Sequence, residues 1–148
     1  MIIKSMAAPE GEMADNEFLF PVRVYYEDTD AGGIVYYANY LKFAERCRSE
    51  FIRYLGGRQQ EDLESENKTG WVVRHCEVDY LKPAVLDDEL VVSCRITNVG
   101  GVTATMYQEI RRGAEVLVTI DVKAAHVSLI SKKPVRIPSE FKMRITDN

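Results

Sequence analysis

One helical pattern, with strand-like patterns on both sides of it, most constrains the fold that this chain can adopt. From residue 40 onward, apolar residues recur at intervals of three and four, a period typical of a helix that buries one face. This stripe consists of Tyr40, Phe43, Ala44, Cys47, Phe51, Tyr54 and Leu55. Gly56 and Gly57 end it, because glycine readily adopts the left-handed conformation at a helix C-terminus. The pattern predicts a single amphipathic helix of about five turns.

The other regular patterns alternate with a period of two, which is typical of strands with one buried face. They cover residues 20–26 before the helix and residues 71–81, 89–99, 102–112 and 115–129 after it. Residues 58–68 are polar and charged, and we interpret them as a loop or a ragged helical turn. The sequence therefore predicts an α+β fold in which a five-stranded antiparallel sheet wraps around one long central helix.

Length and composition indicate one domain. A chain of 148 residues with 46% hydrophobic residues can form a core, and we expect a single domain over residues 18–148 behind a flexible leader over residues 1–17. The net charge of −4 and the absence of a dense basic stripe argue against nucleic-acid binding. No apolar run approaches the ~20 residues of a transmembrane helix, so we expect a cytoplasmic protein.

The three cysteines give no sign of a disulfide or a metal site. Cys47, Cys76 and Cys94 are widely spaced, and no pair has the spacing of a zinc motif. Each falls at an apolar position of its predicted element. We therefore expect all three to be buried as small apolar side chains, and we expect no bound metal.

The turn between the first strand and the helix contains the groups best suited to catalysis. Residues 26–39 include Asp28, Asp30, Gly32 and Gly33 directly before the predicted helix. The first N–H groups of a helix lack partners within the helix, and the helix dipole adds partial positive charge there. A carboxylate beside such donors suits the hydrolysis of an activated acyl group.

The same segment resembles a known family. Residues 24–36, followed by residues 39–40 and 45–46, are similar to the hotdog-fold acyl-CoA thioesterases. The resemblance is greatest to the 4-hydroxybenzoyl-CoA thioesterase class and its branch associated with the Tol-Pal envelope system. It extends from about residue 20 to residue 141 and includes residues 86–90. It implies the hotdog fold and acyl-CoA as substrate, with acyl carrier protein as a possible alternative carrier, and no cofactor, since coenzyme A is part of the substrate.

The resemblance also implies an assembly and catalytic groups. Two subunits would join edge strands into one sheet, either as a homodimer or with dimers pairing into a homotetramer, and the active sites would lie at the subunit interface. Asp30 corresponds to the catalytic carboxylate, acting either as a nucleophile or as a general base. The backbone N–H of Tyr37 corresponds to the group that polarises the thioester carbonyl. We interpret Asp28 as a turn or capping residue.

Other residues are weaker candidates. Gly33, Val35 and Tyr36 are expected to contact substrate, and Lys132 and Lys133 to bind the phosphates of coenzyme A or, alternatively, to form a solvated tail. Glu45 lies eight residues after Tyr37, and we expect it to support catalysis. The alternatives for Glu45 are the catalytic carboxylate itself or an exposed ion pair with Lys42 or Arg48.

In its histidines this chain departs from the usual pattern of two related groups of proteins. The Tol-Pal-associated branch often has histidine where this chain has Tyr37, and hotdog dehydratases usually rely on a histidine with an acid. His75 and His126 are both far from the turn in sequence, and we interpret them as structural or surface groups. A dehydratase and an acyl-CoA-binding protein without turnover remain the alternative functions.

Overall fold

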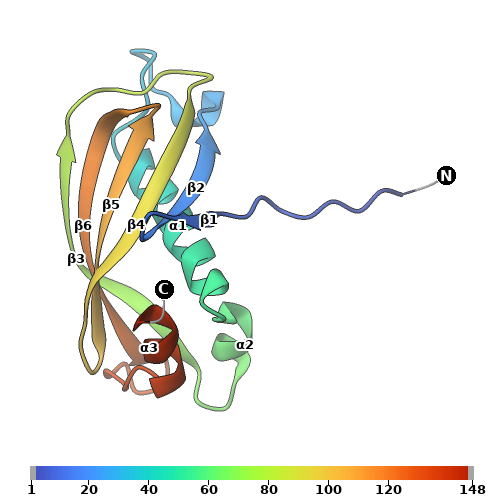
Figure 1. Ribbon diagram of the computed structural model, residues 1–148, viewed down its shortest axis with the longest axis vertical. Coiled ribbons are helices and arrows are strands. Elements are labelled where there is room, and N and C mark those ends of the chain that lie inside the picture. The colour runs from blue at the N-terminus through green and yellow to red at the C-terminus, as the bar shows by residue number, and fades with distance from the viewer. Residues whose placement is uncertain (1–2, 147–148) are drawn as a thin grey trace.

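One antiparallel sheet and a long helix against one of its faces make up most of the structure, a computed structural model that describes residues 3–146 (Figure 1). The strand order is β1-β2-β4-β5-β6-β3. The strands are β1 (Glu12–Ala14), β2 (Glu17–Arg23), β3 (Thr69–Tyr80), β4 (Glu89–Val99), β5 (Thr103–Arg112) and β6 (Glu115–Ser128). The helices are the 3-10 helix η1 (Tyr26–Asp28), α1 (Asn39–Tyr54), α2 (Gln59–Glu64) and α3 (Ser139–Thr146).

Helix α1 packs its apolar stripe against the inner face of the sheet. Phe43 and Cys47 on the helix are fully buried in the same cluster as Val92, Ile110 and Ile120 on the strands. The predicted stripe therefore faces the sheet, and the α+β arrangement with one long helix is confirmed. Within residues 3–146 no helix is both long and apolar enough to span a membrane.

The sheet has six strands where five were predicted. The additional strand is β1, which pairs with β2 through a turn at Asp15 and Asn16, both with positive φ. Residues 12–17, which were predicted as part of a flexible leader, thus form most of a hairpin at one edge of the sheet. A three-residue strand is too short to produce a recognisable alternation in the sequence.

Strand β3 forms the other edge of the sheet. A bulge between Val73 and His75 shifts its register against β6. Trp71 and Val73 therefore share the inner face with Cys76, whereas Val72, which was predicted to share a face with Cys76, lies on the other. Cys76 is exposed, because no strand flanks β3 on its outer side and α1 lies over β2 and β4. The expectation of burial is confirmed for Cys47 and Cys94 and is wrong for Cys76.

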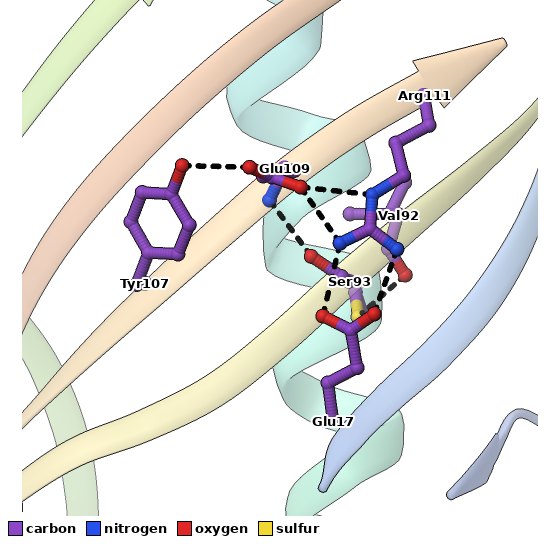
Figure 2. A network of polar contacts seen from close by, with 7 residues as sticks. Glu17, Val92, Ser93, Tyr107, Glu109 and Arg111 are labelled. Atoms are coloured by element: carbon purple, nitrogen blue, oxygen red, sulfur yellow. Dashed lines mark hydrogen bonds and ion pairs between the residues drawn. The ribbon is translucent and has the colours of Figure 1, made fainter. Parts of the chain in front are cut away.

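The outer face of the sheet carries a polar network that joins three strands (Figure 2). Arg111 on β5 forms ion pairs of 2.7 Å with Glu17 on β2 and with Glu109 on its own strand. Tyr107 donates a hydrogen bond to Glu109, and the N–H of Glu109 donates to Ser93 on the intervening strand β4. These contacts tie the N-terminal hairpin to the centre of the sheet.

Candidate active site

A tight hairpin positions Asp30 directly before helix α1. The N–H of Asp30 donates to the Ile34 carbonyl at 2.9 Å, and the N–H of Tyr36 donates to the Asp28 carbonyl at 2.9 Å. The turn between them closes through the Gly33 N–H and the Asp30 carbonyl. Gly33 has φ of +82°, a conformation that glycine adopts without the steric cost of a side chain. This turn could be predicted from its two glycines.

The Asp30 carboxylate lies at the tip of the hairpin and is exposed. Its Oδ1 accepts a hydrogen bond of 2.8 Å from the Gly32 N–H, which fixes the side chain against the turn. A Cβ atom at Gly32 would lie 3.2 Å from this oxygen, so a side chain there would crowd the carboxylate. The arrangement holds an accessible carboxylate in one orientation.

Asp28 has a different environment and role. It is buried, and its Oδ2 accepts a hydrogen bond of 2.8 Å from the Tyr25 N–H at the start of η1. Its carbonyl also accepts a bond of 2.9 Å from the side chain of buried Asn39 at the start of α1. Asp28 therefore fastens the hairpin to the strand before it and the helix after it, as its interpretation as a capping residue predicted.

Tyr37 provides a free backbone donor next to this hairpin. No hydrogen bond from its N–H is found within residues 3–146, and the cap residue Ala38 has no side-chain acceptor for the helix start. The Tyr80 hydroxyl donates to the Tyr37 carbonyl at 3.1 Å, which ties this peptide to β3. An unpaired N–H at a helix start attracts a developing negative charge.

The other predicted contacts divide between surface and core. Gly33 and the ring of Tyr36 are exposed beside Asp30. Val35 is 2% exposed, and its N–H donates to the Ala84 carbonyl, so its side chain belongs to the core of the protomer. Ala84 also donates its N–H to the Tyr40 hydroxyl, which clamps the hairpin onto α1. A substrate contact at Val35 stays a prediction.

Glu45 lies on the exposed side of α1, away from the Asp30 hairpin. It accepts a hydrogen bond of 2.6 Å from the Ser49 hydroxyl. Arg48, one of its two expected ion-pair partners, donates instead to the side chain of Gln108 at 2.9 Å. Glu45 is also among the residues that line a cavity.

Lys132 and Lys133 follow β6, whose last residue pairs with Thr69 at one end of β3, whereas Tyr37 is bonded to Tyr80 at the other end of β3. Both lysines are exposed, and one protomer does not bring them beside Asp30. His126 is buried against Trp71, with ring centroids 5.0 Å apart, and His75 is exposed beside Glu77. Both histidines have the structural or surface positions predicted for them.

A cavity of about 280 Å³ opens under the C-terminal half of α1. Its walls come from α1, α2, α3, the start of β3 and the inner face of the sheet. Trp71 and Phe141 line it, with their ring centroids 5.8 Å apart. Neither residue was singled out from the sequence, because contacts between β3 and a C-terminal helix leave no periodic signal.

Comparison with known proteins identifies the family of this chain. The model of the thioesterase superfamily matches residues 32–119, which include the helix start and most of the sheet. The chain belongs to this thioesterase superfamily. It is 48% identical over 130 residues to the acyl-CoA thioesterase YbgC of Haemophilus influenzae, covering 88% of this chain and 95% of the relative.

Two further matches support the same family. The acyl-CoA thioester hydrolase YbgC of Escherichia coli is 41% identical, over 84% of this chain and 96% of the relative. The crystal structure of a probable thioesterase from Bartonella henselae is 39% identical with a TM-score of 0.78, and the match covers 81% of this chain and 98% of that one. The hotdog thioesterase fold predicted from residues 24–36 is thereby confirmed.

Proposed function

We propose that this protein is an acyl-CoA thioesterase in which Asp30 attacks the thioester or activates the attacking water. The observation that carries the proposal is the pairing, on one short segment, of an accessible carboxylate with a free N–H at a helix start. Family membership supports the reaction class, since the relatives matched over most of their length are named acyl-CoA thioesterases.

The reaction needs two groups, and the segment supplies both. A thioester is an activated acyl donor, so an oriented carboxylate suffices as nucleophile or general base. In the first route Asp30 forms an acyl anhydride that water then cleaves, and in the second it takes a proton from water as the water attacks. In both, the carbon–sulfur bond breaks and coenzyme A leaves as the thiol. The Tyr37 N–H binds the carbonyl oxygen as negative charge develops on it, a contact worth ~3 kcal/mol.

A homodimer through β3 completes this account. β3 is a twelve-residue edge strand, and such an edge offers unpaired N–H and C=O groups to another strand. Antiparallel pairing of two β3 strands about a two-fold axis near mid-strand places the Tyr80 end of each beside the Thr69 end of the other. Because Tyr80 is bonded to Tyr37, the Asp30 hairpin of one copy then approaches the cavity of the second copy.

The same pairing gives roles to the distant candidates. Lys132 and Lys133 follow β6 at the Thr69 end of β3, so in the dimer they lie toward the Asp30 hairpin of the other copy. There they bind the phosphates of coenzyme A or the acidic surface of acyl carrier protein. Glu45 lines the cavity and supports substrate binding. Pairing of dimers into a tetramer and a link to the Tol-Pal envelope system rest on the family resemblance, and a cytoplasmic location stays a prediction from the sequence.

Thiol release from acyl-CoA tests the reaction class. Wild-type protein is incubated with acyl-CoAs of graded chain length and with benzoyl-CoA, and free coenzyme A is followed with a chromogenic disulfide reagent. We expect multiple turnovers on at least one acyl-CoA. Stoichiometric binding without thiol release would instead identify a protein that binds acyl-CoA and does not hydrolyse it.

A further inference from the structure

The cavity under α1 is built as an apolar space. Ile52 on α1, Met106 on the sheet, Trp71 and Val73 on β3, and Phe141 and Ile145 on α3 face it from different sides. Within residues 3–146, no buried side-chain nitrogen or oxygen lacks a hydrogen-bond partner. Most of the lining residues are apolar, and the polar ones are Glu45, Arg48, Ser49, Gln59, Asp62 and Thr69.

This chemistry discriminates between acyl groups. An aliphatic chain gains from burial against these apolar walls, whereas a hydroxyl group finds a hydrogen-bond partner only beside the polar lining residues on α1, α2 and the start of β3. On the α1 side, Arg48 donates to Gln108 and Ser49 donates to Glu45. The cavity therefore suits an aliphatic chain better than a hydroxylated ring.

The cavity volume indicates the length of the acyl chain that the cavity can hold. A water molecule has a share of about 30 Å³ in the liquid, and a methylene group is of about the same size, so a cavity of about 280 Å³ holds about nine such groups. A chain of about eight to ten carbons fills that space.

Helix α3 lines the cavity through Phe141 and Ile145 and is held in place by Arg144. The Nη1 of Arg144 donates to the carbonyl of Leu55 at 3.0 Å, where α1 ends, and a cation is favoured at a helix C-terminus. Gly56 leaves room for this guanidinium, because a Cβ atom there would overlap it. Phe141, three residues before Arg144, is thereby held against Trp71 in the wall of the cavity.

We infer that this cavity binds the acyl chain of the substrate, that it accepts an unbranched aliphatic chain of about eight to ten carbons, and that Phe141 limits the chain length. The inference rests on the proposed thioesterase function and on the β3 dimer. Helix α1 begins at Asn39, so about 9 Å of helix lies between its start and Glu45 in one protomer. In the β3 dimer the acyl chain enters the cavity from the Asp30 hairpin of the second copy.

Substrate profiles of two α3 variants test whether Phe141 limits the length of the acyl chain. Wild-type kcat/KM should peak near decanoyl-CoA and exceed the value for 4-hydroxybenzoyl-CoA at least tenfold. Phe141→Ala should raise the ratio of tetradecanoyl-CoA to decanoyl-CoA by about tenfold or more, since one methylene group alone changes kcat/KM by about that factor in an apolar pocket. Met143→Ala is the matched control, because Met143 lies on α3 but is 63% exposed and outside the cavity. An unchanged ratio in Phe141→Ala, or a preference for 4-hydroxybenzoyl-CoA, would overturn the inference.

A binding measurement tests the cavity assignment independently of the proposed thioesterase activity. Trp71 is the single tryptophan of the chain and lines the cavity, so its emission reports on ligand there. Asp30→Asn protein should show a saturable emission change with decanoyl-CoA, and Phe141→Ala in that background should favour tetradecanoyl-CoA. If wild-type protein shows this emission change but hydrolyses no acyl-CoA, the result would support ligand binding in the cavity and refute the proposed reaction. Decanoyl-CoA binding, measured by calorimetry, without any emission change would refute the cavity.

Discussion

Asp28 and Asp30 are separated by one residue and differ in every property that matters for catalysis. Asp28 is buried and bonded to the Tyr25 N–H, whereas Asp30 is exposed at a turn and bonded to the Gly32 N–H. Turn chemistry and family resemblance predicted this division of roles. The sequence could not show that Val35, expected to contact substrate, has its side chain in the core, because burial depends on the distant Ala84 segment.

At this scale, Gly33→Ala should lower both stability and kcat. Its φ of +82° is unfavourable for alanine, which costs about 1 kcal/mol of unfolding free energy, and relaxation of the turn moves Asp30. Gly113→Ala is the matched control, since Gly113 has φ of +60° in the β5–β6 turn and is likewise free of close contacts. Urea unfolding should show a similar loss for both variants, while thiol-release assays show lower kcat for Gly33→Ala alone. Equal kcat in the two variants would contradict the role of this turn.

At the scale of elements, periodic patterns predicted more than short ones did. Residues 89–99 match β4, and the helical stripe matches α1 to within one residue at either end. β1 has three residues, and α3 follows residues for which no pattern was recognised. Because of the bulge in β3, the residues on the inner face of this strand differ from those predicted, since one unpaired residue reverses the alternation that follows it.

The network in Figure 2 predicts unequal roles for two neighbouring arginines. Arg111 is 23% exposed and pairs with Glu17 and Glu109, so Arg111→Met leaves two carboxylates close together without a cation. We expect a loss of about 1–3 kcal/mol in unfolding free energy. Arg112→Met removes more exposed ion pairs with Asp88 and Glu115, which solvent screens, and should cost clearly less. Urea unfolding of both variants measures the difference, and equal losses would show that the network adds nothing.

Glu109 should make the sheet sensitive to acid. Burial alone would raise its pKa, but hydrogen bonds from Tyr107 and Arg111 outweigh this and hold the pKa below its usual 4.5. A lowered folded-state pKa stabilises the fold above the unfolded-state value, and this contribution is lost as pH falls through the folded-state pKa. The free energy of unfolding should therefore fall below about pH 4.5, and less steeply in Glu109→Gln. If the free energy of unfolding falls equally steeply in wild type and Glu109→Gln between about pH 5 and about pH 3, Glu109 does not make this contribution.

At the scale of the whole molecule, one protomer leaves its longest edge strand, β3, open. The inner face of this strand carries the exposed Cys76. The resemblance predicted an assembly through edge strands. The residues that would meet across it could not be predicted, because the bulge sets which side chains of β3 face inward.

Cys76 lies near the middle of β3 and therefore near the expected symmetry axis. Cys76→Glu places two carboxylates close together in the dimer, so it should shift the protein toward monomer and reduce activity. Cys76→Ser keeps the size of the side chain and should remain dimeric and active. Sedimentation velocity and thiol release, measured at the same protein concentrations, test both expectations. A Cys76→Glu dimer as stable as that of Cys76→Ser would place the interface elsewhere.

The most direct measurement is kcat for thiol release by Asp30→Asn and Asp28→Asn, each compared with wild type. Asparagine retains an oxygen that can accept the turn hydrogen bond at either position, so both variants should fold. We predict that Asp30→Asn lowers kcat by about 10²–10⁴-fold, because it removes the nucleophile or base, while Asp28→Asn stays close to wild type. Wild-type turnover in folded Asp30→Asn would contradict the assignment of Asp30 as nucleophile or general base. Loss of activity in Glu45→Gln, together with that result, would identify Glu45 as the catalytic carboxylate instead.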